Sequence, residues 1–247
     1  MGKCDNKVVI VTGAAQGIGE AYARGFASEG AQVVVADIDL DKATAVSQSI
    51  GDAAVPVCVD VADVDSTTAM AAAAVEAFGG IDVLVNNAAI YAGMTIDSLL
   101  NVDWDYYQRF MQVNMNGALL CARAVHRHIA RRGGGAIINQ SSTASWVYSG
   151  FYGLAKIGIN GLTQQLAHEL GHSKIRVNAI APGPIDTEAT RSIVPEEIVD
   201  EIVNQLALKR RGTPQDLVGM CTFLASDEAS WITGQIFNVD GGHVMRP

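Results

Sequence analysis

The sequence predicts an α/β fold in which a mainly parallel, seven-stranded sheet is doubly wound and flanked by helices, with residues 1–247 forming a single domain. Short apolar runs alternate with helical segments, which is typical of repeated strand–helix–strand units with right-handed crossovers. The apolar runs are continuous, as in Val8-Val9-Ile10-Val11, and this is expected of strands buried on both faces. With 49% hydrophobic and only 17% charged residues, the chain can form a large core.

The expected elements follow from local signals. Gly30 ends the first helix, and Gly133-Gly134-Gly135 turns into the fifth strand. The second, third and fourth strands close on Asp37, Asp60 and Asn86-Asn87. The predicted strands span residues 8–11, 32–36, 55–59, 81–85, 136–139, 175–180 and 235–239. The predicted helices span residues 18–28, 41–49, 65–78, 103–131, 152–171, 196–206 and 214–225.

Charge and composition narrow the class of protein. The formal net charge of −9 argues against nucleic acid and anionic membranes as partners. No apolar segment reaches the length of a membrane span, and residues 1–7 are polar, unlike a secretion signal. Four cysteines, Cys4, Cys58, Cys121 and Cys221, lack paired spacing and are expected to be buried thiols in a reducing compartment. The sequence therefore predicts a soluble cytoplasmic protein.

A glycine-rich turn with glycines at positions 13, 17 and 19 separates the first strand from the first helix. Backbone N–H groups of such a turn, together with the helix N-terminus, can face the pyrophosphate of a dinucleotide. Asp37 ends the second strand, where a carboxylate accepts hydrogen bonds from an adenosine ribose and repels a 2′-phosphate. Because residues 14–16 and 38–39 contain no Lys or Arg to bind that phosphate, we expect NAD rather than NADP as the cofactor.

A second set of polar residues surrounds the start of the helix at Tyr152. Tyr152 and Lys156 are four residues apart and therefore share one face of the helix. An ammonium beside a phenol favours the phenolate, so we expect Lys156 to lower the pKa of Tyr152 from its usual value of about 10. Ser142 is expected to donate a hydrogen bond to a substrate oxygen. This combination is suited to general acid/base catalysis of alcohol–carbonyl interconversion.

One motif points to a different chemistry. His168-Glu169-Leu170-Gly171-His172 matches the H-E-x-x-H pattern of zinc peptidases. Zinc catalysis requires both histidines on a stable helix together with a third ligand. Gly171 lies where this helix is expected to end, and no obvious third ligand follows. We therefore expect no metal.

Taken together, the residues resemble the short-chain dehydrogenase/reductase family from Val8 to Gly242. The motifs that carry the resemblance are Thr12-Gly13-x-x-x-Gly17-x-Gly19, Asp60-Val61, Asn86-Asn87-Ala88, Asn114, Ser142, Tyr152-x-x-x-Lys156 and Pro182-Gly183-Pro184-Ile185-x-Thr187. The resemblance implies a Rossmann domain and an NAD(H)-dependent oxidoreductase that interconverts a secondary alcohol and a ketone by hydride transfer. The alternatives are a 3-oxoacyl-thioester reductase, a non-catalytic dinucleotide-binding protein, and a lyase or epimerase.

The resemblance also implies residue roles. Tyr152 acts as the general acid/base and Ser142 orients the substrate oxygen. Lys156 lowers the pKa of Tyr152 and binds the nicotinamide ribose, and Asn114 holds a water in a proton relay. The residues implied in cofactor binding are Gly13, Gln16, Gly17, Ile18, Gly19, Asp37, Asp60, Val61, Asn87, Ala88, Tyr152, Lys156, Pro182, Gly183, Ile185 and Thr187. By the same resemblance we expect a homotetramer with contacts through residues 103–131, 152–170 and 238–247.

Two departures from the family pattern affect the substrate side. Ala89 stands where the family usually has glycine, and the loop between Ser142 and Tyr152 is shorter than usual, which leaves Ser141 as an alternative to Ser142. The pocket walls are expected in residues 90–94, 145–148 and 186–206. Apolar residues in these ranges include Tyr91, Met94, Trp146, Tyr148, Ile193 and Val194. Since few charges lie there, we expect an apolar secondary alcohol or ketone as the substrate.

Overall fold

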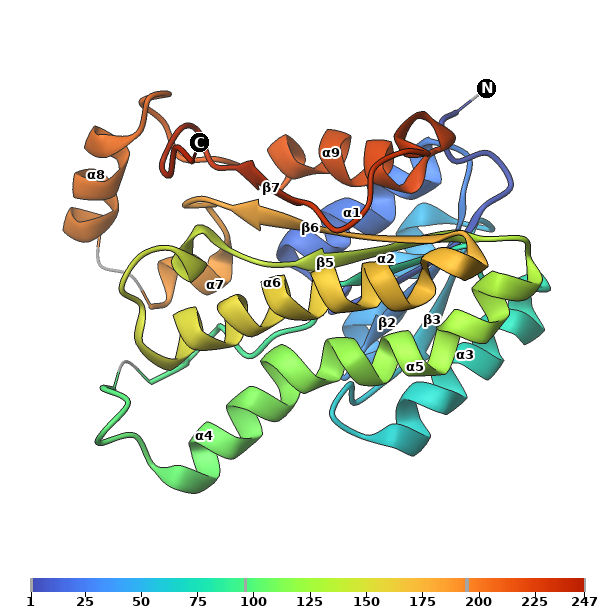
Figure 1. Cartoon of the computed structure of the whole chain (residues 1–247), viewed down its shortest axis with the longest axis horizontal. Helices are drawn as coiled ribbons and strands as arrows, with labels where there is room; N and C mark the ends of the chain where they lie inside the picture. Colours follow the sequence, from blue (N-terminus) through green and yellow to red (C-terminus); the bar gives the residue numbers. More distant parts are fainter. Residues whose placement is uncertain (1, 96, 194–195, 247) are drawn as a thin grey trace.

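The computed structural model describes residues 2–95, 97–193 and 196–246. A seven-stranded sheet with the order β3-β2-β1-β4-β5-β6-β7 runs through the centre of the molecule (Figure 1). The strands are β1 (Val8–Thr12), β2 (Gln32–Asp37), β3 (Ala54–Cys58), β4 (Val83–Asn86), β5 (Gly135–Gln140), β6 (Ile175–Pro182) and β7 (Ile236–Val239). All pairings between these strands are parallel. The predicted doubly wound α/β fold is therefore confirmed, with an all-parallel rather than a mainly parallel sheet.

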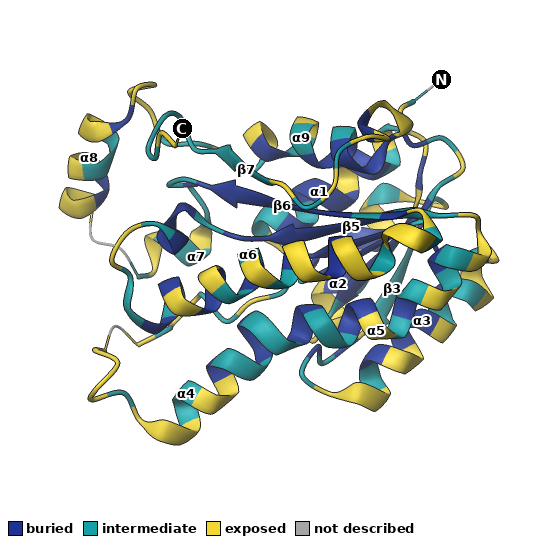
Figure 2. Ribbon diagram, in the orientation of Figure 1, coloured by how far each residue is buried: buried dark blue, intermediate teal, exposed yellow. Residues whose placement is uncertain are grey.

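Helices cover both faces of the sheet. One face carries α1 (Gly17–Ser28), α2 (Leu40–Ile50) and α9 (Gln215–Ala225), and the other carries α3 (Val64–Phe78), α5 (Gly117–Arg131) and α6 (Gly150–Leu170). The remaining helices are α4 (Trp104–Met111), α7 (Glu188–Arg191) and α8 (Glu196–Gln205). Short 3₁₀ turns span Thr143–Ser145, Gly171–Ser173 and Asp227–Ala229. Figure 2 shows buried strands between helices whose outer faces are exposed, so each face of the sheet has its own apolar core.

Buried polar side chains link β4, β5 and α6 in the interior. Asn86 and Asn139 are register partners on β4 and β5, and Nδ2 of Asn86 donates to Oδ1 of Asn139 at 2.9 Å. Nδ2 of Asn139 in turn donates to Oγ1 of Thr163 on α6, also at 2.9 Å. Asn139 and Thr163 are fully buried, and these hydrogen bonds offset the free-energy cost of removing their polar groups from water.

The segment expected to form one long helix over residues 103–131 contains a change of helix type. A π-helical turn, Gln112–Asn116, connects α4 and α5. Within it, Oδ1 of Asn114 accepts a hydrogen bond from Ile90 N at 2.7 Å, and Nδ2 of Asn114 donates to Ile90 O at 2.9 Å. π-helical turns act as one-residue insertions and occur often at functional sites. The turn ties the helix to the loop that follows β4.

Other differences from the sequence prediction are small. Helix α7 was not predicted, because four residues are too few to show a helical period; Thr187 caps it by accepting a hydrogen bond from Thr190 N at 3.1 Å. Cys58 is exposed rather than buried, because it ends β3 at the surface. Strand and helix ends otherwise shift by up to two residues. Within the described residues, no helix is both long enough and apolar enough to cross a membrane.

Candidate active site

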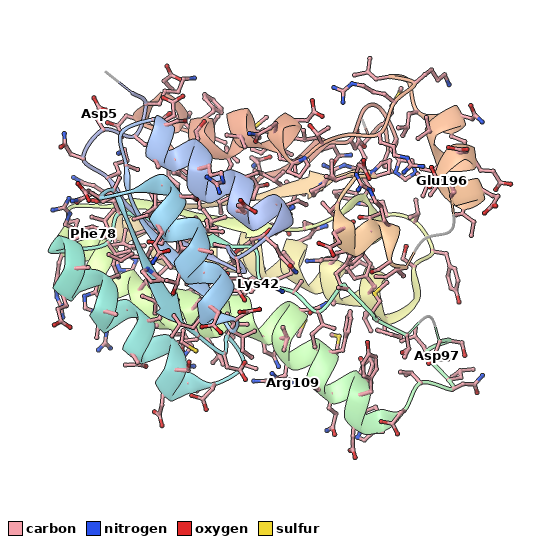
Figure 3. The ribbon with its side chains drawn as sticks, turned by 180° about the vertical axis from the view of Figure 1, so that it is seen from behind. Asp5, Lys42, Phe78, Asp97, Arg109 and Glu196 are labelled. Carbon is pink, nitrogen blue, oxygen red and sulfur yellow. The ribbon has the colours of Figure 1, made fainter. Side chains whose placement is uncertain are left out.

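A cleft of about 1110 Å³ opens along the carboxyl ends of the strands. It is lined by the predicted residues Gly13, Gln16, Gly17, Ile18, Gly19, Asp37, Asp60, Val61, Asn87, Ala88, Ser142, Tyr152, Lys156, Pro182, Gly183, Ile185 and Thr187. Asn114 lines a small cavity next to the cleft. In Figure 3, Asp97, a further lining residue, and Glu196 of α8 lie at one end of the molecule, and Arg109, which also lines the cleft, lies nearer its middle. One cleft therefore joins motifs that are up to 174 positions apart, from Gly13 to Thr187.

The glycine-rich turn has the conformation that its sequence requires. Gly13 has φ +64° and Gly17 has φ +59°, values that residues other than glycine rarely adopt. A Cβ on Gly13 would lie 2.7 Å from the Cα of Ala88, and a Cβ on Gly19 would overlap the carbonyl oxygen of Gly13. Gln16, the N-cap of α1, makes no side-chain capping hydrogen bond. The first N–H groups of α1 are therefore available to an anion in the cleft.

Two carboxylates follow the glycine turn along the cleft. Asp37 is held by two backbone donors: Ala15 N to its Oδ2 and Asp39 N to its Oδ1, each at 3.0 Å. Asp60 accepts from Ala62 N at 2.9 Å and pairs with the Arg109 guanidinium at 3.0 Å. Both carboxylates are oriented by the fold itself. The Asp37 carboxylate lines the cleft at the end of β2.

Asn87 connects the ends of β1 and β4. Its Nδ2 donates to the carbonyl oxygens of Thr12 and Gly13, each at 3.0 Å, and its own backbone N–H donates to the Thr12 hydroxyl at 3.1 Å. Ala89, which stands where glycine was expected, is exposed and has no positive φ. The methyl group of Ala89 is therefore accommodated without backbone strain.

Tyr152 lies in the first turn of α6, and aromatic packing positions it. The preceding residue, Phe151, is 3% exposed and packs edge-on against Phe110 of α4 with ring centroids 4.7 Å apart. The ring of Tyr91 lies 5.5 Å from that of Tyr152 on the other side. These contacts hold the phenol of Tyr152 at the wall of the cleft.

The pKa of Tyr152 shifts in the direction opposite to the expected one. Its withdrawal from water and the neighbouring Tyr91 raise the pKa of the phenol above its ordinary value, and hydrogen bonding with Ser142 has a smaller, lowering effect. The Nζ of Lys156 lies 5.7 Å from the centroid of the Tyr152 ring and donates to the Gln140 carbonyl at 2.8 Å. Spacing places the two residues on one helix face, but burial is the largest influence on the Tyr152 pKa and raises it.

Lys156 is also removed from water, being 3% exposed. Burial lowers the pKa of its ammonium group to about 8. Lys156 and Asn114 both line the small cavity behind the cleft, whose volume of about 10 Å³ is close to that needed by one water molecule. The side chain of Asn114 makes one hydrogen bond through Oδ1 and one through Nδ2, both to Ile90, which leaves one N–H and one lone pair of the amide for a water.

The two adjacent serines have different environments. Ser141 is 2% exposed and donates to Oδ1 of Asn160 at 2.6 Å, away from Tyr152. Ser142 accepts from Ala144 N at 3.1 Å, which leaves its own O–H free to donate, and it is near enough to Tyr152 to lower the pKa of the phenol. Ser142 is therefore the serine that faces Tyr152.

The substrate end of the cleft matches the expected pocket in part. Tyr91, Met94 and Tyr148 line it, whereas Trp146 does not and instead lies 3.9 Å below the Arg246 guanidinium. Ile193 is also outside the lining, and Val194 lies outside the described residues. The pocket prediction was thus wrong for Trp146 because the C-terminal segment covers its ring.

Sequence reasoning missed several polar residues of the cleft, among them Arg109 and His243. Nδ1 of His243 lies 3.2 Å from the Thr143 hydroxyl, next to Ser142. His243 directly follows Gly241-Gly242, which have φ +65° and +79° after the last strand. The signal that could have identified His243 is its position directly after two glycines at the end of the last strand.

The H-E-x-x-H motif does not form a metal site in the described part of the chain. Helix α6 ends at Leu170, and His172 lies in the 3₁₀ turn that follows, with its Nδ1 at the Glu169 carbonyl. Across residues 2–95, 97–193 and 196–246, no three His, Cys, Asp or Glu side chains are grouped to hold a metal ion.

Known proteins match this sequence and fold. The family described as enoyl-(acyl carrier protein) reductase matches residues 13–244. An uncharacterized oxidoreductase of Mycobacterium tuberculosis is 66% identical over 98% of this chain and 99% of the relative. The galactitol 2-dehydrogenase of Agrobacterium fabrum is 38% identical, with the same coverage of both chains.

A solved structure extends the comparison to three dimensions. It is 7α-hydroxysteroid dehydrogenase complexed with NADH and 7-oxo glycochenodeoxycholic acid, which is 33% identical to this chain. The TM-score is 0.92, and the match covers 98% of this chain and 96% of the other. With a family match over most of its length and relatives well above 30% identity, the chain belongs to the short-chain dehydrogenase/reductase family.

Proposed function

We propose that the protein is an NAD(H)-dependent oxidoreductase that interconverts an apolar secondary alcohol and a ketone, with residues 1–247 forming one domain. One observation carries the proposal: Tyr152, Ser142 and Lys156 meet at the wall of the cleft that also contains the glycine turn and Asp37. The match to a dehydrogenase complexed with NADH supports it.

Each polar side chain at the reactive end has one task in this proposal. The free O–H of Ser142 donates to the substrate oxygen. Tyr152 takes the hydroxyl proton during oxidation and returns it during reduction. Lys156, when charged, stabilises the negative charge that develops on the Tyr152 oxygen, and a water beside Asn114 connects Lys156 to solvent.

The cleft fits a dinucleotide along its length. NAD supplies the hydride acceptor when it is bound. The N–H groups at the start of α1 would hold the pyrophosphate, with Gly13 and Gly19 allowing close approach. Asp37 would bind the adenosine ribose and Asp60 with Val61 would contact the adenine. Residues 182–187, among them Ile185 and Thr187, would hold the nicotinamide carboxamide.

Replacing Asp37 is expected to change cofactor choice. In Asp37→Ser the carboxylate that repels a 2′-phosphate is removed, so the ratio of kcat/KM for NAD to that for NADP should fall by about 10- to 100-fold. Initial rates with each cofactor measure this ratio. Asp41→Asn, a change at an exposed acid in the first turn of α2, is the matched control, and its NAD-to-NADP ratio should stay within about twofold of the wild-type ratio. An unchanged ratio in Asp37→Ser would refute the assignment of Asp37.

The pH dependence of reduction should report the buried lysine. The pKa of Lys156 is lowered to about 8, so its positive charge is present below this pH and lost above it. Since the pKa of Tyr152 is raised, the loss of the Lys156 proton comes first as pH increases. We expect kcat/KM for ketone reduction to fall above pH 8, and Lys156→Arg to remove this fall at a lower overall rate. A profile that stays flat to pH 10 contradicts the role of Lys156.

The substrate class is tested with a panel of alcohols and ketones. Tyr91, Met94 and Val147 give this end of the cleft an apolar wall, which favours a hydroxysteroid-like alcohol over a polyol. NADH formation would be followed with bile-acid or other steroid alcohols, with polyols such as galactitol, and, in reverse, with 3-oxoacyl thioesters. Turnover of steroid alcohols is expected. Turnover of polyols alone would contradict the apolar assignment.

The match to the enoyl-(acyl carrier protein) reductase description favours one second candidate, an acyl-thioester reductase. Efficient reduction of a 3-oxoacyl thioester, without activity on free alcohols of the panel, would replace the first proposal with this one. Tight NADH binding without turnover of any substrate would favour a binding protein. We also propose a homotetramer, which light scattering of the purified protein tests directly.

A further inference from the structure

We infer that Gln140 is a further cofactor-binding residue, whose side-chain amide donates a hydrogen bond to an oxygen of the nicotinamide half of the dinucleotide. The inference rests on the proposed function and deepens it. Gln140 is the last residue of β5, is 8% exposed, and lines both the cleft and the small cavity behind it.

The position of Gln140 is unusual for an amide. Ala136 and Ile138 precede it on the same side of β5, and both belong to the apolar core beneath α1 and α9. Gln140 continues this row at the carboxyl end of the strand. A buried amide there is costly unless all its polar atoms have partners.

One of its polar atoms has a partner inside the protein. The hydroxyl of Tyr22, a fully buried residue of α1, donates to Oε1 of Gln140 at 2.9 Å. Burial raises the pKa of Tyr22, so this hydroxyl is a neutral donor. If the amide were turned over, its Nε2 would face Tyr22, and the buried hydroxyl hydrogen would lose the acceptor that the structure provides. Tyr22 therefore fixes the amide with its oxygen inward.

The amide nitrogen is thus left to face the cleft. None of the hydrogen bonds between described residues uses Nε2 of Gln140, and this atom is not among the fully buried unpaired atoms. Its two N–H groups are preorganised donors at the edge of the cleft. The ligand atom that suits them is an acceptor oxygen.

The location along the cleft selects the nicotinamide half. Strand β5 is two strands from β1, which carries the glycine turn, so Gln140 lies about 10 Å along the sheet from the expected pyrophosphate site. Its backbone carbonyl accepts from Lys156 Nζ at 2.8 Å, and Ser142 follows two residues later. Gln140 therefore lies beside the reacting groups, where a carboxamide oxygen or the neighbouring ribose hydroxyls would be found.

Two ligands distinguish a contact to the nicotinamide half from a general disturbance of the cleft. NADH contains that half, whereas ADP-ribose contains the pyrophosphate and the adenosine ribose without nicotinamide. Dissociation constants for both would be measured by calorimetry on wild type, Gln140→Met, Tyr22→Phe and the control Gln48→Met, a change on the exposed face of α2.

We expect Gln140→Met to weaken NADH binding by about tenfold and ADP-ribose binding by less than about twofold. Tyr22→Phe removes only the buried hydroxyl, keeps the packing, and should weaken NADH binding by about threefold because the amide is no longer fixed. Gln48→Met should change neither constant.

Unchanged NADH binding in Gln140→Met, or equal weakening of both ligands, would overturn the inference. If Gln140→Met does not fold, the Tyr22→Phe result with the two ligands decides in the same way. Failure of the wild type to bind NADH would instead overturn the proposed function, so the two failures can be told apart.

Discussion

Tyr152→Phe is expected to reduce turnover by about a thousandfold while leaving NADH binding nearly unchanged. General acid/base groups contribute roughly 10²- to 10⁴-fold to rates, and this substitution removes only the oxygen that exchanges the proton. The phenyl ring keeps its place beside Tyr91, and Phe151 remains packed on Phe110. Steady-state kinetics with the best alcohol of the panel and an NADH titration measure the two quantities separately.

Tyr107→Phe is the matched control for this experiment. Tyr107 packs edge-on against Phe151 with centroids 6.5 Å apart and does not line the cleft. It tests the loss of a phenolic oxygen in the same aromatic cluster, and its rate should stay within about twofold of wild type. Comparable rates for Tyr152→Phe and wild type would eliminate Tyr152 as the acid/base.

Gly19→Ala is expected to abolish measurable cofactor binding, weakening it by at least about 100-fold. The added Cβ would overlap the Gly13 carbonyl oxygen and lie 2.6 Å from Nδ2 of Asn87. The glycine turn must then move away from the end of β4, and the N–H groups at the start of α1 lose their alignment. Overpacking at this contact should also lower the free energy of unfolding by roughly 1–3 kcal/mol. An NADH titration and urea unfolding test both effects.

Gly219→Ala provides the opposite expectation for the same chemical change. Gly219 lies within α9, and a Cβ there would meet nothing within 4 Å. Alanine in an open helical position stabilises by roughly 0.5–1 kcal/mol relative to glycine, and NADH binding should not change. If both variants bind NADH as wild type does, the glycine turn does not hold the cofactor.

Residue spacing predicts those features of this protein that are local in the sequence, and it does not predict those that depend on distant contacts or on burial. The parallel strands and most of the cleft lining followed from motifs whose positions relative to strand ends are local properties, as with Asp37 at the end of β2. The π-helical turn at Asn114 did not follow, because it depends on a long-range contact with Ile90. The direction of the Tyr152 pKa shift was wrong, since spacing places Lys156 beside Tyr152 but does not reveal how far both are removed from water.

At the start of α6, too, spacing predicted the helix but not its first residue. The helix was predicted to begin at Tyr152 but begins at Gly150, whose φ of +55° turns the chain into the helix. Tyr152 is therefore the third residue of the helix, within its first turn, instead of its first residue. His243 was missed because its position next to Thr143 depends on the path of the C-terminal segment, which no local periodicity encodes.

The hydrogen bonds that run from Asn86 through Asn139 to Thr163 affect the register of β4 against β5. A slip of one residue moves every side chain of a strand to the opposite face of the sheet, so burial already specifies the register, and a buried polar pair specifies it further. A shift of β4 by one residue against β5 would separate Asn86 from Asn139 and leave Oδ1 of the buried Asn139 without its donor, at a cost of roughly 1–3 kcal/mol. The hydrogen bond therefore favours the native register of β4 against β5, which sets how the ends of these two strands align at the cleft.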